Sequence, residues 1–208
     1  MTVRVITMTK QFRRALVAAV SVPVFAVAAC GSPGPGMDHG SGGMGSAPSG
    51  STSASGAVNP ADIMFAVMMI PHHEQAVEMA DLVPTRTTNT DLLALAAEIK
   101  DAQQPEITQM QGWLKGWGTD VAAMGDHASH GGMAGMQSDE AVAELAALED
   151  DSFDRRWMEM MIDHHEGAVT MAKDVIAKGS DPAVRALAEQ VITAQQAEIA
   201  QMTGMLGG

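Results

Sequence analysis

The sequence is poor in cysteine, aromatic residues and basic residues. Cys30 is the only cysteine, so no disulfide within the chain can stabilise the fold. Lys and Arg number 12 against 25 Asp and Glu, which gives a formal net charge of −13 at pH 7. So acidic a chain repels the phosphate backbone of nucleic acids, and it offers neither a basic stripe nor a series of stacking aromatic residues. The composition therefore argues against both a disulfide scaffold and a nucleic-acid-binding protein.

Sequence motifs of two enzyme classes are also missing. No Gly-x-Ser-x-Gly occurs, and the single cysteine ends an apolar run near the start of the chain, so nothing supports nucleophilic catalysis. Carboxylate-bridged iron and manganese proteins usually take a Glu-x-x-His pair from each of two helices, and no such pair occurs here. We therefore expect a binding protein rather than an enzyme.

Residues 1–29 have the features of an export signal. Four basic residues precede an apolar run, 15–29, that is too short to span a bilayer permanently. The last residues of the run, with Cys30, read Val-Ala-Ala-Cys and resemble the lipobox of bacterial lipoproteins, in which the cysteine becomes the lipid-modified first residue. An ordinary signal peptide is the alternative. We predict a protein anchored by lipid at Cys30 to the extracytoplasmic face of the cell membrane, with 8 basic against 25 acidic residues after cleavage, a formal charge of −17.

Composition divides the rest of the chain into a tether and one domain. Residues 30–58 are mostly Gly, Ser, Pro and Ala, so we predict a flexible tether. Residues 59–207 are enough for one domain with its own core. No segment of this domain alternates polar and apolar residues as a strand would. We therefore predict an all-α domain.

An internal repeat organises this domain. The sequence Met-Met-Ile-Pro-His-His-Glu-Gln-Ala-Val-Glu-Met-Ala begins at Met68 and returns 92 residues later, from Met160, as Met-Met-Ile-Asp-His-His-Glu-Gly-Ala-Val-Thr-Met-Ala. The same offset carries Ala-Gln-Gln-Pro-Glu-Ile-Thr-Gln-Met onto Ala-Gln-Gln-Ala-Glu-Ile-Ala-Gln-Met. A register kept this long indicates duplication of a two-helix unit. Repeat one spans 59–117, a Met/His-rich linker spans 118–137, and repeat two spans 138–207.

Caps, turns and apolar periodicity predict the helices of the two repeats. Long helices are expected over 59–83, 91–117, 152–178 and 181–206, with a short helix within 138–150. Two equivalent helical hairpins bury their apolar stripes best as an antiparallel four-helix bundle.

Two prolines fall inside these predicted helices. Pro71 and Pro105 each remove a backbone hydrogen bond and kink a helix, but the apolar pattern runs on through both. We therefore predict kinked, continuous helices, and the alternative is a first helix that begins at Pro71.

Helical phasing separates the residues of the repeated motif. At 100° per residue, His72 and His73 face the apolar side among methionines, whereas Glu74 faces solvent. Residues 164–166 of the second copy divide in the same way. The adjacent glutamate is therefore not expected to share a site with its histidines.

Two other carboxylates lie in the apolar stripes of the partner helices. Glu106 and Glu198 must be paired, protonated or bound to a metal, because burying a lone carboxylate costs several kcal/mol. Folding repeat one at its turn, 84–90, sets Glu106 about one helical turn, ~5 Å along the axis, from the level of His72. We predict an interior with these polar residues in two halves: His72, His73, Gln103 and Glu106, and His164, His165, Gln195 and Glu198.

Imidazole and thioether together suit copper, with Cu(I) preferring sulfur and Cu(II) preferring nitrogen. The chain has 18 methionines, where leucine would pack a core equally well. Loose segments with Met37, His39 and 124–136 could also collect metal, although plain linker composition explains them as well. We predict copper binding, for buffering or transfer to a metal-handling partner, at the following residues: His72, His73, His164, His165, Met68, Met69, Met79, Met160, Met161, Met171, Glu106 and Glu198.

Two alternatives remain open from the residues alone. One is a carboxylate-bridged iron or manganese oxidase built on Glu106 and Glu198, although only these two glutamates point inward. The other is a metal-free structural or interaction bundle, in which each buried histidine is paired with a glutamate and methionine fills an irregular core.

The repeated motifs also resemble a known family. Met-Ile-x-His-His-x-x-Ala-Val-x-Met-Ala, followed by Ala-Gln-Gln-x-Glu-Ile-x-x-Met, is similar to the bacterial family of domain of unknown function 305, over about residues 60–206. The resemblance implies an exported, ferritin-like helical bundle. Since some members are associated with periplasmic copper binding and tolerance, it also implies copper binding by the neighbouring methionines and by His72, His73, His164 and His165.

Overall fold

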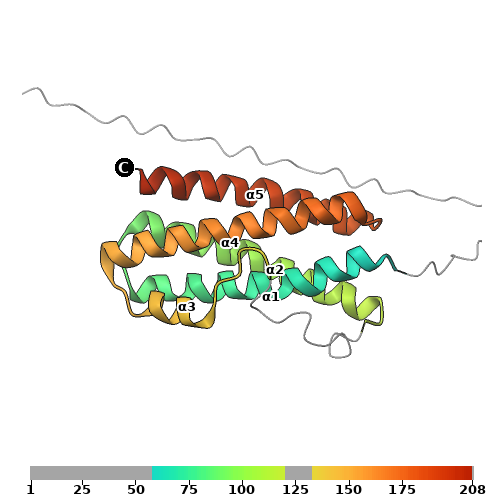
Figure 1. The fold of residues 1–208 in the computed structure, drawn as a ribbon, viewed down its shortest axis with the longest axis horizontal. Coiled ribbons are helices and arrows are strands. Elements are labelled where there is room, and N and C mark those ends of the chain that lie inside the picture. The colour runs from blue at the N-terminus through green and yellow to red at the C-terminus, as the bar shows by residue number, and fades with distance from the viewer. Residues whose placement is uncertain (1–57, 120–132, 208) are drawn as a thin grey trace, which may run out of the picture. The chain divides into compact units, whose positions relative to one another are not determined.

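The computed structural model describes residues 58–119 and 133–207, and every regular element in these two ranges is helical (Figure 1). The elements follow in the order α1 (Pro60–Leu82), the short 3₁₀ helix η1 (Val83–Thr85), α2 (Thr90–Gly116), α3 (Asp139–Ala146), α4 (Asp150–Lys178) and α5 (Pro182–Leu206). The all-α prediction is confirmed, and each predicted helix lies within a few residues of its expected bounds. In these ranges, no helix is both long and apolar enough to cross a membrane. The predicted signal, Cys30 and all of the tether except Val58 fall outside the described residues.

Side-chain caps begin α1, α2, α3 and α5, whereas α4 has none. Asn59 Oδ1 accepts from the backbone N–H of Ala61 at 2.8 Å, and Asn89 and Asp181 cap α2 and α5 in the same way. Pro71 lies inside α1 and Pro105 lies inside α2, and both helices continue through them. The prediction of continuous helices is confirmed, and the alternative start at Pro71 is wrong.

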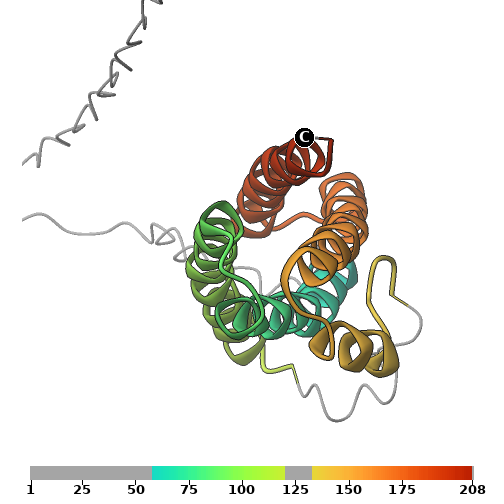
Figure 2. The same ribbon diagram turned by 90° about the vertical axis from the view of Figure 1, so that its left-hand side faces the viewer.

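The long helices pack as two antiparallel hairpins, α1 with α2 and α4 with α5, which meet where α1 packs on α4 (Figures 1 and 2). Two apolar clusters fill the interior at opposite ends of these helices. One cluster includes Phe65, Met69, Met110, Ala168, Val175, Leu187 and Val191. The other includes Met79, Leu92, Leu95, Ile99, Phe153, Trp157, Met161 and Met202. The polar residues of the two predicted halves lie between these clusters along each long helix. They form a layer at mid-height, which we call the polar layer and which consists of His72, His73, Gln103, Glu106, His164, His165, Gln195 and Glu198.

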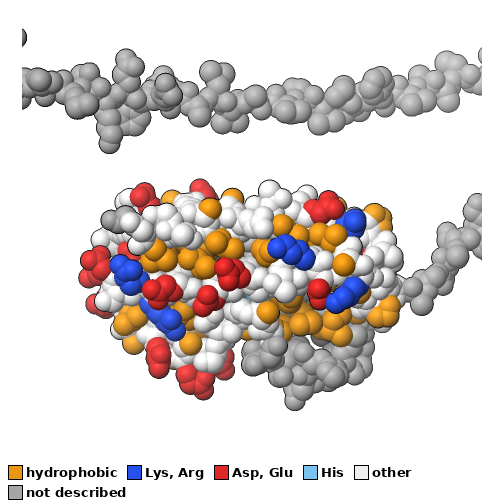
Figure 3. All heavy atoms as spheres, turned by 45° about the horizontal axis from the view of Figure 1, so that its top comes forward, with side chains coloured by type: hydrophobic (Ala, Val, Ile, Leu, Met, Phe, Trp, Pro, Cys, Tyr) orange, Lys and Arg blue, Asp and Glu red, His pale blue; other side chains and the backbone are white. Residues whose placement is uncertain are grey.

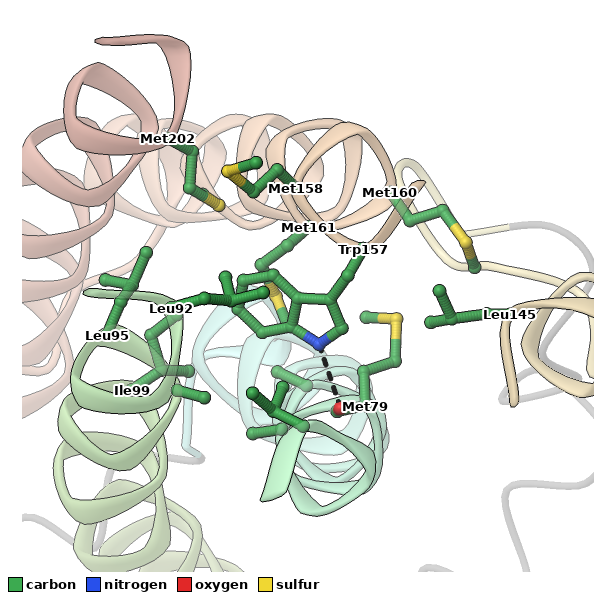
Figure 4. Packing of buried hydrophobic residues seen from close by; sticks show 14 of the residues in the cluster. Met79, Leu92, Leu95, Ile99, Leu145, Trp157, Met158, Met160, Met161 and Met202 are labelled. Atoms are coloured by element: carbon green, nitrogen blue, oxygen red, sulfur yellow. Dashed lines mark hydrogen bonds between the residues drawn. The ribbon is translucent and has the colours of Figure 1, made fainter. Parts of the chain in front are cut away.

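Trp157 shows how the second cluster is held together. It is fully buried, and its indole N–H donates to the carbonyl of Met79 at 2.9 Å (Figure 4). A buried indole usually needs such a partner, so the largest core side chain joins α4 to α1 without an unpaired polar atom.

A buried aspartate from each repeat ties the two hairpins together. Asp62 Oδ2 accepts from the backbone N–H groups of Ser180 and Asp181, which lie in the turn of the second hairpin. Asp154, its counterpart in the other repeat, accepts from the side-chain amide of Asn89 in the turn of the first hairpin. Each hairpin thus anchors the turn of the other through charge-assisted hydrogen bonds.

Candidate metal centre

Two histidine–glutamate pairs lie in the polar layer. His73 Nε2–H donates to Glu106 Oε2 at 2.7 Å, and His165 Nε2–H donates to Glu198 Oε2 at 2.6 Å. Both imidazoles are fully buried, and the glutamates are 19% and 16% exposed. Both glutamates reach the interior as predicted, but they remain partly exposed and therefore lie at the edge of the apolar stripe, not in its middle. Glu106 pairs with His73, however, and not with His72, the histidine from which its axial position was estimated.

The other two histidines meet each other across the hairpins. The ring centroids of His72 and His164 are 3.7 Å apart, with the ring planes inclined by 37°. His164 and His165 have centroids 6.2 Å apart. The two halves predicted from the repeats therefore join through the contact between His72 and His164. All four histidines are fully buried, in agreement with the absence of histidine colour from the described surface visible in Figure 3.

Burial keeps the central pair neutral. Desolvation lowers the pKa of His72 to about 3, with a smaller lowering from His73 and His165 and an opposing contribution from a hydrogen bond to the carbonyl of Ala134. Burial also lowers the pKa of His164 well below 6.5, and the neighbouring imidazoles, His72 first, lower it further. At neutral pH both rings therefore carry free nitrogen lone pairs, which are what a metal ion binds.

Several ring nitrogens have no hydrogen-bond partner in the described part of the chain. They are Nδ1 of His72, His73, His164 and His165, and Nε2 of His164. The buried amides of Gln103 and Gln195 also have unpaired atoms. Buried polar atoms without partners cost free energy, so this concentration in one layer needs an explanation. An imidazole that donates one nitrogen to a carboxylate and leaves the other free has the usual arrangement of a metal-binding histidine.

Residues 133–137, which we call the strap, cross α1 and α4 beside the central histidines. The carbonyl of Ala134 accepts from His72 Nε2 at 3.1 Å, which leaves His72 Nδ1 as the ring's free nitrogen. Gln137 exchanges two hydrogen bonds with the side chain of Gln75, each 2.8 Å long. The strap thus fixes one imidazole of the central pair.

Two glycines allow the strap to lie this close to α4. Gly135 has a φ of +81°, and a Cβ there would come within 2.6 Å of the carbonyl of Asp163. A Cβ on Gly167 of α4 would overlap the carbonyl of Ala134. Gly167 occupies the repeat position of Gln75, so the two copies contact the strap by different means.

The predicted methionines fall into two groups. Met69, Met79, Met160 and Met161 are buried, with at most 1% of each exposed. Met68 and Met171 are only half-buried and line a surface groove between α1 and α4. Within the described ranges, no three His, Cys, Asp or Glu side chains gather where they could hold a metal. A metal in the polar layer would therefore need thioether ligands or a rearrangement of the imidazoles.

Other sequence expectations have mixed outcomes. Glu74 and Glu166 are exposed, as the phasing predicted. Met37, His39 and most of 124–136 lie outside the described residues, and Met133 of the strap is buried. Sequence reasoning missed the strap, although the glycines flanking its methionines were a signal of close backbone approach.

Comparison with known proteins identifies relatives of the chain. Residues 62–206 match the family described as Domain of unknown function (DUF305). A candidate secreted protein of that family from Streptomyces coelicolor is 31% identical, with a TM-score of 0.65 over 71% of this chain and 92% of that chain. CopM in its Cu(II)-bound form is 34% identical, with a TM-score of 0.60 over 70% of this chain and 95% of that chain, and CopM is also solved with Cu(I) and with Ag.

A curated viral relative is similar over a shorter stretch. Uncharacterized protein L153 of Acanthamoeba polyphaga mimivirus is 38% identical over 53 residues, 26% of this chain. The chain spans about a third, 35%, of the length of that relative. The family match covers well over half of the chain, and it agrees with the histidine–methionine motifs of both repeats. The chain belongs to the DUF305 family.

Proposed function

We propose that this protein is an extracytoplasmic, lipid-anchored copper-binding protein that buffers copper or passes it on. The observation that carries the proposal is a set of five buried imidazole nitrogens in one layer that have no hydrogen-bond partner among residues 58–119 and 133–207. Neutral imidazole is a good ligand for Cu(II), and the buried methionines add soft sulfur for Cu(I). The residues present therefore fit copper. CopM, a relative solved with Cu(II) and Cu(I), supports the same conclusion.

Each group has a defined role in this proposal. His72 and His164 offer lone pairs at the contact between the hairpins, and the pKa of each is low enough that protons compete weakly with the metal. Glu106 and Glu198 each accept a hydrogen bond from one of the other two imidazoles and so fix its orientation. Bound copper would supply a redox-active centre.

We also propose that the long helices form a ferritin-like four-helix bundle. The antiparallel hairpins and the packing of α1 on α4 support this arrangement. Further support comes from the two apolar clusters, since both contain residues of α2 and α5. Export to the cell envelope is supported by the signal-like residues 1–29 and by the Streptomyces relative, described as a candidate secreted protein.

Metal competition tests the function directly. The chain without residues 1–29 and with Cys30→Ser should be offered copper, iron, manganese and zinc together, and the retained metals measured. Copper should dominate, and His72→Gln with His164→Gln should reduce retained copper at least tenfold. The matched control is Glu74→Gln with Glu166→Gln, which changes exposed residues beside the same histidines and should have no effect.

Two results would replace this proposal. Retention of two iron ions per chain with oxidase activity would favour a carboxylate-bridged iron protein built on Glu106 and Glu198. Retention of no metal would favour a structural bundle whose histidines are simply paired in the core.

A further inference from the structure

The outer face of the α1–α4 pair has three parts with different coverings. At one end, α3 packs on the face with buried Val142 and Leu145 (Figure 1). The strap crosses the middle. At the other end lies a groove of about 250 Å³, which no element of the described ranges covers in the way α3 covers the first. The groove is lined by Ala61, Met64, Phe65 and Met68 of α1 and by Met171, Asp174, Val175 and Lys178 of α4.

The repeat supplies an internal comparison for this groove. The offset of 92 residues carries Met68 onto Met160 and Met171 onto Met79, which lie under α3. Figure 4 shows Leu145 of α3 directed toward both Met79 and Met160, which are 0% and 1% exposed. The same pair of thioethers is therefore fully buried in one copy and half-buried beside the groove in the other.

The open copy also gains a third thioether. Met64 corresponds to Arg156 in the second repeat. It is 40% exposed and is the one large hydrophobic side chain in the described ranges that is so exposed. Met64 and Met68 are four residues apart, so their side chains emerge about 5–6 Å from each other on the same side of α1. A leucine would fill such a position without placing sulfur at the surface.

The chemistry of the groove favours a soft monovalent ion. Thioether sulfur is a soft, uncharged ligand that binds Cu(I) and Ag(I) and discriminates against harder divalent ions. Long, unbranched methionine side chains can rotate so that several sulfurs converge on one ion. The one carboxylate at the rim, Asp174, is already paired with Lys178 at 2.8 Å, so it offers little to a divalent cation.

We propose that Met64, Met68 and Met171 form a second metal site, for Cu(I) or another soft monovalent cation, separate from the histidine centre. The site needs no histidine, so it stands independently of copper binding in the polar layer. Its position on the outer face makes it accessible without opening the core.

Silver titration followed by NMR tests the site residue by residue. The Cys30→Ser chain without residues 1–29, labelled with ¹³C at the methionine methyl groups, is titrated with Ag(I) alone. The first equivalent should shift the methyl signals of Met64, Met68 and Met171 before those of the buried methionines. Zn(II) should leave these three signals unchanged.

Matched variants separate this site from a general effect of methionine. Met64→Leu, Met68→Leu and Met171→Leu together should weaken binding of the first silver ion at least tenfold. The control, Met110→Leu with Met202→Leu, changes two fully buried methionines that are not among the predicted copper ligands, and it should leave that affinity within twofold. Unchanged far-ultraviolet circular dichroism would show that both variants fold.

A third variant distinguishes this proposal from the proposed function. His72→Gln with His164→Gln should keep the silver-induced shifts in the groove even where copper is no longer held in the polar layer. The proposal is overturned if the three groove signals stay unchanged at one equivalent of silver, or if the control pair weakens binding as much as the groove variant does.

Discussion

The two repeats are alike in the polar layer and differ on the outer face of the α1–α4 pair. In the layer, each repeat contributes the same groups, one histidine paired with a glutamate and one histidine at the central contact, although the strap bonds only His72 of the central pair. On the outer face, equivalent positions have diverged: Gln75 of the first repeat corresponds to Gly167 of the second, and Met64 corresponds to Arg156. The segment between the repeats lies on that face, as the strap and α3. Symmetry is thus kept where the two hairpins meet and is broken where a third segment packs on them.

Acid should have the largest effect, and it acts on the symmetric layer. The pKa of His72 is about 3 in the folded protein and about 6.5 in an unfolded chain, so the unfolded chain binds more protons between these values. Above pH 7, His72 should therefore not reduce the free energy of unfolding of the metal-free protein, because this imidazole is neutral in both states. That free energy should fall by roughly 1 kcal/mol for each pH unit below about 6 through His72 alone. His164 acts in the same direction.

Urea unfolding at pH 7.5 and 4.5 measures this loss, which should be roughly 2 to 3 kcal/mol or more. The variant His72→Gln should lose less stability over the same interval. An equal pH dependence in both proteins would show that the buried pair does not control it.

The asymmetric face is tested by Gly167→Ala. The added methyl group would overlap the carbonyl of Ala134, so either the strap or α4 must move. We expect a loss of about 2 kcal/mol in the free energy of unfolding, because overpacking against backbone is relieved only by breaking contacts. Gly112→Ala is the control, since Gly112 lies in α2 with nothing within 4 Å of an added Cβ, and alanine there should stabilise the helix slightly. A loss at Gly112 as large as that at Gly167 would contradict the strap contact.

The equality of the two halves is open to a direct test. Glu106→Gln and Glu198→Gln each replace a charge-assisted hydrogen bond to a buried imidazole by a neutral one. Each should cost about 1 kcal/mol in thermal or urea unfolding, and the two losses should agree within about 0.5 kcal/mol. A loss at only one position would mean that the layer is not energetically symmetric.

The symmetric features were also the ones that the sequence predicted best. Helical periodicity placed all four histidines, Glu106 and Glu198 inside, because an amphipathic helix has one apolar side whatever its neighbours are. The pairing of Glu106 with His73 was not predicted, because a turn sets the axial level of a residue but not its angle to the opposite helix. The contact of His72 with His164 depends on how two hairpins dock, which no local pattern encodes.

The outer face was predicted less well for a related reason. The strap has no helical or strand periodicity, and its path depends on backbone contacts at Gly135 and Gly167. Met68 and Met171 were grouped with the buried methionines, because their periodicity marks an apolar side but not whether another segment covers it. Coverage by α3 distinguishes them from Met160 and Met79.

The smallest expected effect is on stability, and it compares Met64 at the groove with Met79, which lies under α3. Met79→Leu alters a fully buried side chain and should cost about 1 kcal/mol, because a branched side chain of similar volume must repack against its neighbours. Met64→Leu changes a side chain that is 40% exposed and should alter the free energy of unfolding by less than about 0.5 kcal/mol. Urea unfolding of the metal-free proteins at pH 7.5 compares them. A cost at Met64 that equals the cost at Met79 would mean that Met64 contributes to packing, as a core methionine does, and is not a free ligand at the groove.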